Sequence, residues 1–303
     1  MTQMKKTRIL TALILSATMG LTACGGGDSS KETSNKEKSS DGEKVLKTYF
    51  SDTPQTLNPH TTADNYELLL DMSATLYREV WDEETGAKTY VASLADGDPV
   101  CNDDEHKVWT IKVKDGYTFA DGTGINAETV EYSIKMLNDP KLANRNVNAT
   151  NFENGDAYLK GECDWEEVGF QAVDENTLEV TYAKNYEPES EKDVKDLFCF
   201  VGTALVKPEL YESCLNEDKT ETFMASALYE PTSLIQGQYL ELTRRTDGKA
   251  PLEDVFTPDK VEYQAITDAN TIVQMFEKGE LDAVVANQPA YVMFIPSIIT
   301  EFT

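Results

Sequence analysis

The sequence predicts an α/β fold, and three observations lead to this prediction. Short runs that alternate apolar and polar residues, as strands do, occur along the chain. Between them lie segments with apolar residues at helical spacing, separated by turn residues. The 303 residues, 40% of them hydrophobic, are enough for a large core and set a prior of about two domains.

The expected strands follow from alternation and from the turns that end them. Residues 45–50 form the first, and Pro54 stops it because proline cannot continue a ladder. Residues 108–113 alternate strictly, which predicts a half-buried antiparallel strand followed by an Asp-Gly turn. The further expected strands are 117–119, 178–182, 261–266 and 282–286.

The expected helices follow from the spacing of apolar residues and from capping signals. Residues 66–81 carry an apolar stripe at helical spacing. Asn126 is expected to cap a helix that runs to residue 137. The charged segment 184–196 is expected to be a solvated loop or a short helix. The remaining expected helices are 205–215 and 269–277.

The charge of the chain excludes one class of partner. There are 54 acidic and 27 basic residues, a formal net charge of −27. A nucleic-acid-binding protein needs a basic face to neutralise phosphates, so no nucleic-acid partner is expected. The same charge disfavours binding of the folded body to anionic lipid headgroups.

The N-terminus predicts export and a lipid anchor. A basic segment precedes an apolar run at 9–21, which is too short to span a hydrocarbon core of about 30 Å, so residues 1–23 are predicted to be a signal peptide. Leu-Thr-Ala before Cys24 resembles the bacterial lipoprotein box, which implies lipid attachment at Cys24. Residues 24–43, rich in Gly, Ser and charge, are expected to be a flexible tether. We therefore expect a protein held by lipid on the outer face of the cell membrane.

The other cysteines leave two alternatives open. Cys101, Cys163, Cys199 and Cys214 could form one or two disulfides in an oxidising setting, with connectivity that the sequence does not determine, or stay free thiols. The chain has no Cys-x-x-Cys motif, and its two histidines, His60 and His106, are far apart in the sequence. We therefore expect no metal or redox site and no cofactor.

Motifs that point to an enzyme are weak. Residues 122–127 imitate a dinucleotide-binding fingerprint, but the preceding strand alternates where a continuously apolar one is needed. The acidic residues of 96–105 lack the spacing of a calcium loop. No Gly-x-Ser-x-Gly or His-Glu-x-x-His motif is present. We expect no catalytic residues, and a secreted hydrolase remains a minor alternative.

Several segments of the chain form an ordered set. They are Thr-Leu-Asn-Pro at 56–59, the expected helix at 69–80, the strand, turn and aromatic stretch at 109–123, the helix start at 126–133 and Gly-Glu-Leu-Asp at 279–282. In this order they resemble the family-5 extracellular solute-binding proteins, the peptide receptors of ABC importers. The resemblance runs from about residue 45 to 286 and departs from the family at 235–239, where the family's Gly-Pro stretch is absent.

This resemblance implies a periplasmic-binding-protein-like fold with two lobes (type II, cluster C). Residues 44–64 with 200–303 correspond to an incomplete first lobe, and 65–199 to a subdomain inserted in it. Family members are much longer, so the resemblance also implies that most of the second lobe is missing and that the chain is truncated.

The resemblance implies capture of an oligopeptide or dipeptide for import, without bond chemistry, by a monomer that delivers to permease and ATPase subunits. The expected ligand contacts are Asp52, Thr53, Pro54 and Asn58, in the loop after the first strand, and Trp165. Alternatives are another ligand on the same fold (a nickel complex, haem or an oligosaccharide), or a surface sensor or adhesin without a role in transport.

Overall fold

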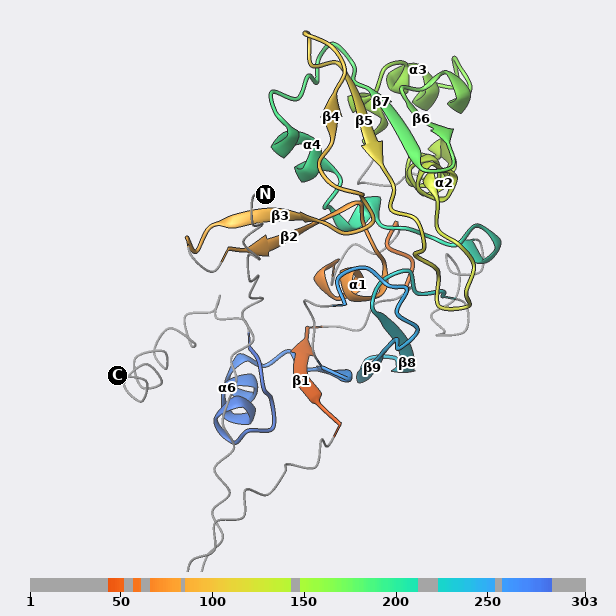
Figure 1. Ribbon diagram of the computed structural model, residues 1–303. Coiled ribbons are helices and arrows are strands. Elements are labelled where there is room, and N and C mark those ends of the chain that lie inside the picture. The colour runs from red at the N-terminus through yellow and green to blue at the C-terminus, as the bar shows by residue number, and fades with distance from the viewer. Residues whose placement is uncertain are drawn as a thin grey trace, which may run out of the picture.

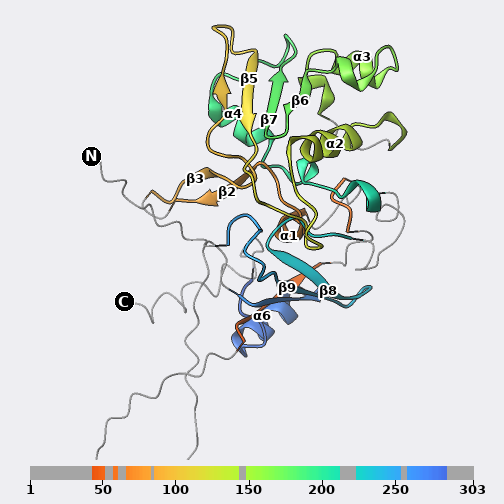
Figure 2. The same ribbon diagram turned by 45° about the vertical axis from the view of Figure 1, so that its right-hand side comes forward.

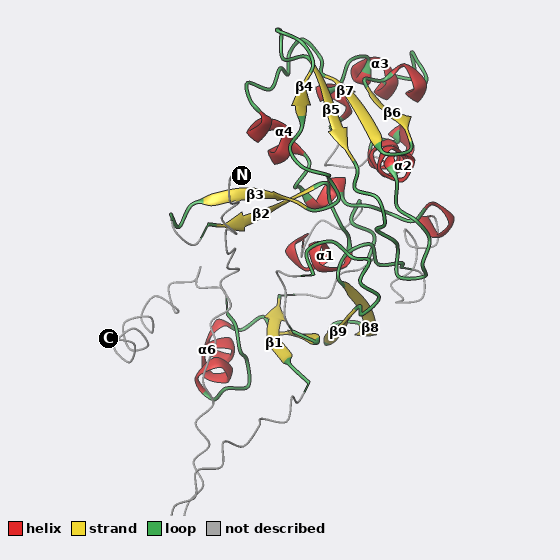
Figure 3. Cartoon of the chain, in the orientation of Figure 1, coloured by secondary structure: helices red, strands yellow, loops and turns green. Residues whose placement is uncertain are grey.

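The computed structural model describes residues 43–51, 57–60, 66–82, 85–142, 148–211, 223–253 and 258–284. These residues form a four-stranded upper sheet, a four-stranded lower sheet and a two-stranded hairpin between them (Figures 1 and 3). The predicted signal peptide, Cys24 and almost all of the predicted tether lie outside the described residues. Within the described part, no helix is long and apolar enough to cross a membrane.

The upper sheet is antiparallel, in the order β4-β5-β7-β6. Trp109 and Ile111 of the second strand are buried whereas Lys112 is exposed, so the predicted half-buried antiparallel strand is confirmed. Phe170 and Val180 extend the same upper core, which also includes the rings of Phe152 and Phe198. The strands are β4 (Val100–Cys101), β5 (Val108–Lys112), β6 (Phe170–Asp174) and β7 (Thr177–Thr181).

Helix α2 (Ala127–Leu137) packs on the upper sheet and begins where the sequence predicts. The Asn126 side chain accepts a hydrogen bond from the Thr129 amide (2.9 Å), so the predicted cap is confirmed. Glu131, on the same helix, accepts from the Ala172 amide of β6 (2.9 Å) and from the indole of Trp165 (3.0 Å). The helix is therefore fixed to the sheet by polar contacts as well as by its apolar face.

The lower sheet has the order β1-β10-β9-β8 and joins the two ends of the described chain. β1 (Val45–Phe50) pairs in parallel with β10 (Lys260–Ala265), and the other pairs, with β9 (Tyr239–Arg244) and β8 (Tyr229–Ile235), are antiparallel. Residues 282–283 run along the other side of β1, where the Asp282 amide donates to the Lys47 carbonyl (2.8 Å). The predicted strand 282–286 is thus an irregular edge as far as residue 284, and its remainder lies outside the described residues.

Two helices cover opposite faces of the lower sheet, with α1 above it and α6 below it in Figure 2. Phe50 belongs to the lower core with Leu69 and Met72 of α1 (Tyr66–Met72). Tyr49 points the other way and packs with apolar residues of α6 (Ala269–Glu277). Successive residues of one strand thus serve two cores, because strand side chains alternate between faces.

The predicted helix 66–81 is wrong in its second half. The helix ends at Met72, and residues 77–81 form β2 (Tyr77–Trp81), paired with β3 (Lys88–Ala92). The Met72 carbonyl accepts from the amides of Ser226 and Ala227 (3.0 Å each), bonds that lead the chain out of the helix. Residues four apart in sequence, such as Leu76 and Val80, lie on one face of a helix and also on one face of a strand. The apolar stripe therefore fitted a helix over its whole length.

Other elements differ in smaller ways. Residues 117–119 are not a strand but a turn closed by one bridge between Thr118 and Gly124. Of the predicted helix 205–215, a 3-10 turn at Pro208–Leu210 is present, and residues 212–215 lie outside the described part. The charged segment 184–196 contains a short helix, α4 (Glu191–Leu197), which is one of the two predicted alternatives. The remaining elements are α3 (Gly155–Leu159), α4 (Glu191–Leu197) and the 3-10 turns Pro140–Leu142, Ala149–Asn151, Trp165–Glu167 and Val201–Thr203.

Candidate functional site

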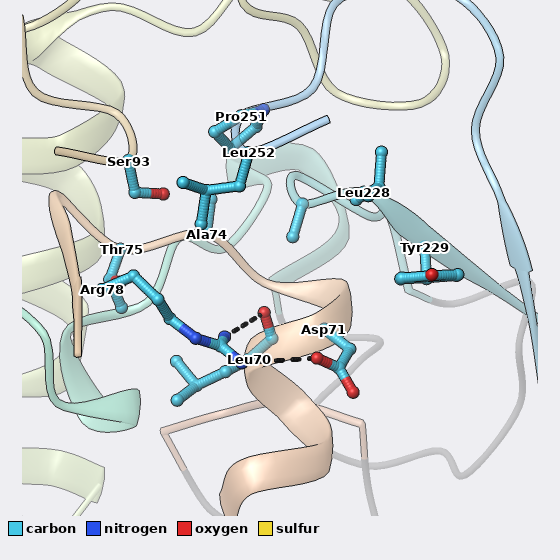
Figure 4. A pocket seen from close by; sticks show the side chains of 11 residues that line it. Leu70, Asp71, Ala74, Thr75, Arg78, Ser93, Leu228, Tyr229, Pro251 and Leu252 are labelled. Carbon is cyan, nitrogen blue, oxygen red and sulfur yellow. Dashed lines mark hydrogen bonds and ion pairs between the residues drawn. The ribbon is translucent and has the colours of Figure 1, made fainter. Parts of the chain in front are cut away.

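A pocket lies at the seam between the upper and lower cores, where α1, the hairpin and β8 meet (Figure 4). Its volume is about 310 Å³ with the open mouth included, but the centre of a water molecule can move through only about 10 Å³ of it. That space holds about one water. The pocket therefore has no room to enclose a peptide in this conformation. Its lining includes Leu70, Asp71, Arg78, Ser93, Leu228 and Leu252.

A charged network forms the floor of this pocket. The Arg78 guanidinium donates to the Leu70 carbonyl (2.8 Å) and pairs with the Asp71 carboxylate (3.4 Å), as Figure 4 shows. The Tyr263 hydroxyl of β10 donates to the other Asp71 oxygen (2.9 Å). Burial, with the Asp71 charge beside it, raises the pKa of Tyr263 well above its ordinary value, so the phenol stays a donor. The network binds α1 to β2 and to the lower sheet.

Leu252, on the opposite wall of the pocket, has an unusual backbone conformation. Its φ is +63°, in the left-handed region that side chains with a Cβ rarely adopt. Figure 4 shows its side chain pointing into the pocket near Ala74. The strained turn thus fills the space that a ligand group at this seam would need.

The predicted ligand loop is described only in part. Asp52, Thr53 and Pro54 lie outside the described residues. Asn58 is fully buried, and its side-chain oxygen accepts from the His60 amide (2.8 Å), which closes a turn. This bond accounts for the position of Asn58 in the fold, and its contact with a ligand stays a prediction.

His60 was not singled out from the sequence, and the structure shows why its position is special. The imidazole is buried, with Nδ1 3.2 Å from the Tyr211 hydroxyl and Nε2 3.2 Å from the Ala204 carbonyl. Burial lowers the pKa of His60 to about 4, although the bond to the Ala204 carbonyl opposes the shift. The ring is therefore neutral near pH 7 and connects the loop after β1 to residues 204–211.

Trp165 lies in the upper core rather than on an open surface. Its side chain is 2% exposed, packs edge-on against Tyr158 and donates to Glu131. These contacts account for the residue without a ligand. Trp165 belongs to the upper core, whereas Asn58 lies in the loop after β1, and no contact between these two described residues is present. The predicted ligand contact of Trp165 stays a prediction.

The cysteines that the structure describes are free thiols. Cys101, Cys163 and Cys199 form no disulfide in the structure, and the choice between disulfides and free thiols stays a prediction. Burial, and to a smaller extent the nearby Asp196 charge, raises the pKa of Cys199 to about 12. Its thiol is therefore unreactive at neutral pH. Cys214 lies outside the described residues. In the described ranges no three His, Cys, Asp or Glu side chains gather as metal ligands would.

The turn at 117–123 is held by an ion pair at its tip. The Lys207 ammonium pairs with the Asp121 carboxylate and also reaches the Thr123 hydroxyl (3.0 Å). Burial alone would raise the pKa of Asp121, but the hydrogen bonds from Lys207 and Thr123 lower it to about 2. The Asp-Gly-Thr tip is thus fixed to the segment that carries Lys207.

A family model described as bacterial extracellular solute-binding proteins, family 5 Middle, matches residues 89–296. The dipeptide-binding protein DppE of Bacillus subtilis is 26% identical over 273 residues, which are 88% of this chain and 47% of that protein. The oligopeptide-binding protein OppA of the same organism is 22% identical over 289 residues, 92% of this chain and 49% of that protein. The chain spans about half the length of these curated relatives.

Solved structures share the fold. Haemophilus influenzae OppA in complex with RPPGFSPFR superposes with a TM-score of 0.72 at 18% identity, covering 86% of this chain and 49% of that one. Listeria monocytogenes OppA bound to peptide gives 0.68 at 19% identity, covering 80% and 46%. Both are peptide-binding proteins of the two-lobed fold, so the predicted fold class is confirmed.

Proposed function

The chain belongs to the family-5 bacterial extracellular solute-binding proteins, and from this premise we propose that it captures extracellular peptides for an ABC importer. The observation that carries the proposal is the family match over residues 89–296, which includes the β5 strand, the 117–123 turn and α2. The relatives are named as dipeptide- and oligopeptide-binding proteins, which supports a peptide over another solute. Binding without bond chemistry follows, because these relatives are binding proteins.

We propose that this chain supplies one wall of the peptide site. The described chain has two main cores joined at a seam, and the seam pocket is too small to bury a peptide. Ligand sites usually bury 70–90% of a small ligand, so a second wall is needed. The division into a first lobe at 44–64 with 200–303 and a subdomain at 65–199 is part of this proposal.

The ligand contacts that we propose come from the loop after β1. Asp52, Thr53, Pro54 and Asn58 follow a strand that is anchored on both sides, by β10 and by residues 282–283. A loop that starts from a fixed strand can present main-chain donors and acceptors to an extended peptide. Such contacts give affinity with little dependence on the peptide's sequence.

Membrane attachment through Cys24 is the second part of the proposal, and the short lipoprotein-like segment before this cysteine supports it. In a bacterial host, the full chain should fractionate with membranes and take up labelled fatty acid. Cys24→Ser should abolish labelling and release the protein. Labelling that persists in Cys24→Ser contradicts the anchor.

Peptide capture is tested with a fusion of residues 24–284 to the part of Bacillus subtilis DppE that lies beyond its matched region. Cooperative thermal unfolding shows first that the fusion is folded. We expect the fusion to retain a mixture of labelled tri- to pentapeptides in equilibrium dialysis and to return them intact. A folded fusion that binds no peptide, or that cleaves peptides, contradicts the proposal. Asp52→Ala in the fusion is expected to weaken retention, with the exposed Glu105→Ala as the matched control.

A further inference from the structure

Arg245 is a buried cation at the seam between the upper and lower cores. It directly follows β9 of the lower sheet, and its amide donates to the Leu228 carbonyl (2.8 Å). Its side chain is 1% exposed. Burying a charge is costly unless it is paired and hydrogen-bonded, so the contacts of this guanidinium have to offset a large desolvation cost.

The guanidinium reaches across the seam to the 117–123 turn, which continues from β5 of the upper sheet. Nη1 donates to the Thr118 carbonyl (2.9 Å), and Nη2 donates to the Thr118 hydroxyl and the Phe119 carbonyl (3.2 Å each). Nη1 also reaches the Ala227 carbonyl (3.3 Å), just before β8, and Nη2 reaches the Asp247 carboxylate (2.6 Å), just after β9. One side chain therefore bonds to both halves of the described chain.

Backbone bonds hold the same two segments together. The Thr118 amide donates to the Lys249 carbonyl (3.1 Å) and the Ala120 amide to the Ala225 carbonyl (2.9 Å). Asp247 completes the arrangement. Burial alone would raise the pKa of this carboxyl, but the hydrogen bonds from Arg245 and the Lys249 amide lower it below its usual value. The carboxylate thus stays charged opposite Arg245 across the neutral range.

We propose that Arg245 is a positioning residue that couples the upper and lower cores into one cooperative unit. Without its five contacts, the lower sheet would keep its own core and be held against the 117–123 turn by the backbone bonds alone. The two sheets would then unfold separately, each with its own free energy of unfolding. This inference goes beyond peptide capture, because the coupling exists with or without a ligand.

The distribution of tryptophan makes the coupling measurable. The three tryptophans of the chain are Trp81, Trp109 and Trp165, and all belong to the hairpin or the upper core, none to the lower sheet. Tryptophan fluorescence therefore follows the upper core during urea unfolding, while hydrogen exchange of β9 and β10 amides follows the lower sheet. Coincident transitions are the sign of a single cooperative unit.

We expect the two transitions to coincide in the unchanged chain. In Arg245→Met, the lower-sheet midpoint should separate and fall by about 1 M urea, with faster exchange in β9 and β10. The matched control is Arg244→Met, the neighbouring arginine, whose side chain donates to the Glu253 carbonyl (2.9 Å). It should leave the transitions coincident.

Three outcomes overturn the proposal: transitions that already differ in the unchanged chain, transitions that fall together in Arg245→Met, or separation in Arg244→Met of equal size. If Arg245→Met does not fold, Thr118→Val removes a single acceptor of the guanidinium. It should separate the same transitions by a smaller interval, and coincidence in Thr118→Val then contradicts the proposal.

Discussion

At the scale of single residues, buried and half-buried polar side chains join segments that lie far apart in the chain. His60 connects the loop after β1 to the 204–211 segment, and Glu131 connects α2 to β6. Each of them satisfies groups that would otherwise be buried without partners, which costs about 1–3 kcal/mol per group. Their loss should therefore be felt in stability more than in surface properties.

The buried imidazole of His60 makes stability depend on pH. Its pKa is about 4 in the folded protein and 6.5 in the unfolded chain, so the unfolded state binds more protons between these values. Stability contributed by the neutral ring is complete above pH 6.5 and is lost as pH falls toward 4, by about 3 kcal/mol at most.

The measurement is the free energy of unfolding from pH 7 to 4, compared between the unchanged chain and His60→Gln. The variant should start less stable at pH 7 and show a flatter decline. His106→Asn changes the other histidine, which is exposed, and should keep the full decline. Parallel curves for the unchanged chain and His60→Gln contradict the assignment.

Residue roles were predictable where they depend on local sequence and not where they depend on distant partners. Asn126 as a cap follows from its position before an apolar helical run. Arg245 has no such signal, because its acceptors Thr118 and Phe119 lie far away in the chain and only the folded seam brings them together. The same holds for Asp71 and its partner Tyr263.

At the scale of elements, α2 and α3 depend on different features of their first residues. α2 begins with a polar cap, in which the Asn126 oxygen accepts from the amide and hydroxyl of Thr129. α3 begins with Gly155, which lies so close to the Ala149 backbone that no side chain fits.

Removing the cap should cost helix stability. We expect Asn126→Ala to lower the free energy of unfolding by about 1 kcal/mol, because the amide of Thr129 loses its acceptor. Asn126→Asp keeps that acceptor and should retain most of the stability. Urea unfolding of the three proteins checks this, and equal losses in both variants would mean that the cap is not the cause.

Gly155→Ala should destabilise the chain even though alanine is a better helix former than glycine. A Cβ at residue 155 would lie 1.7 Å from the Ala149 carbonyl oxygen, whereas at Gly124 a Cβ meets nothing within 4 Å. Overpacking of this kind costs about 1–3 kcal/mol. Gly124→Ala should stay within about 0.5 kcal/mol of the unchanged chain. Thermal unfolding that shifts equally in both variants contradicts the close contact.

The elements that the sequence missed have physical reasons for being missed. β8 contains a proline and an irregular register between Pro231 and Ser233, so its alternation is broken. The helix predicted over 66–81 ends early because Ser226 and Ala227 bond to its last carbonyl. Tertiary contacts determine both the irregular strand and the early end of the helix, and no pattern in the local sequence predicts them.

At the scale of the whole molecule, the segments shared with the family were enough to predict the fold, and the seam was not predictable. The sheet that carries the seam pairs β1 with β10, and the Lys44 amide bonds to Asp259, 215 residues away. The pocket at that seam is lined by residues of α1, of β2 and of the strained turn that contains Leu252, which lie far apart in the sequence. Its small volume is the reason that we assign this chain one wall of a peptide site.

Calorimetric titration of a tri- to pentapeptide mixture into the 303-residue chain and into the DppE fusion, side by side, tests this account most directly. We predict micromolar affinity for the fusion and binding at least about 100-fold weaker for the chain alone, because one wall leaves most of the peptide in water. Micromolar affinity of the chain alone, or a folded fusion with no binding heat, would contradict it.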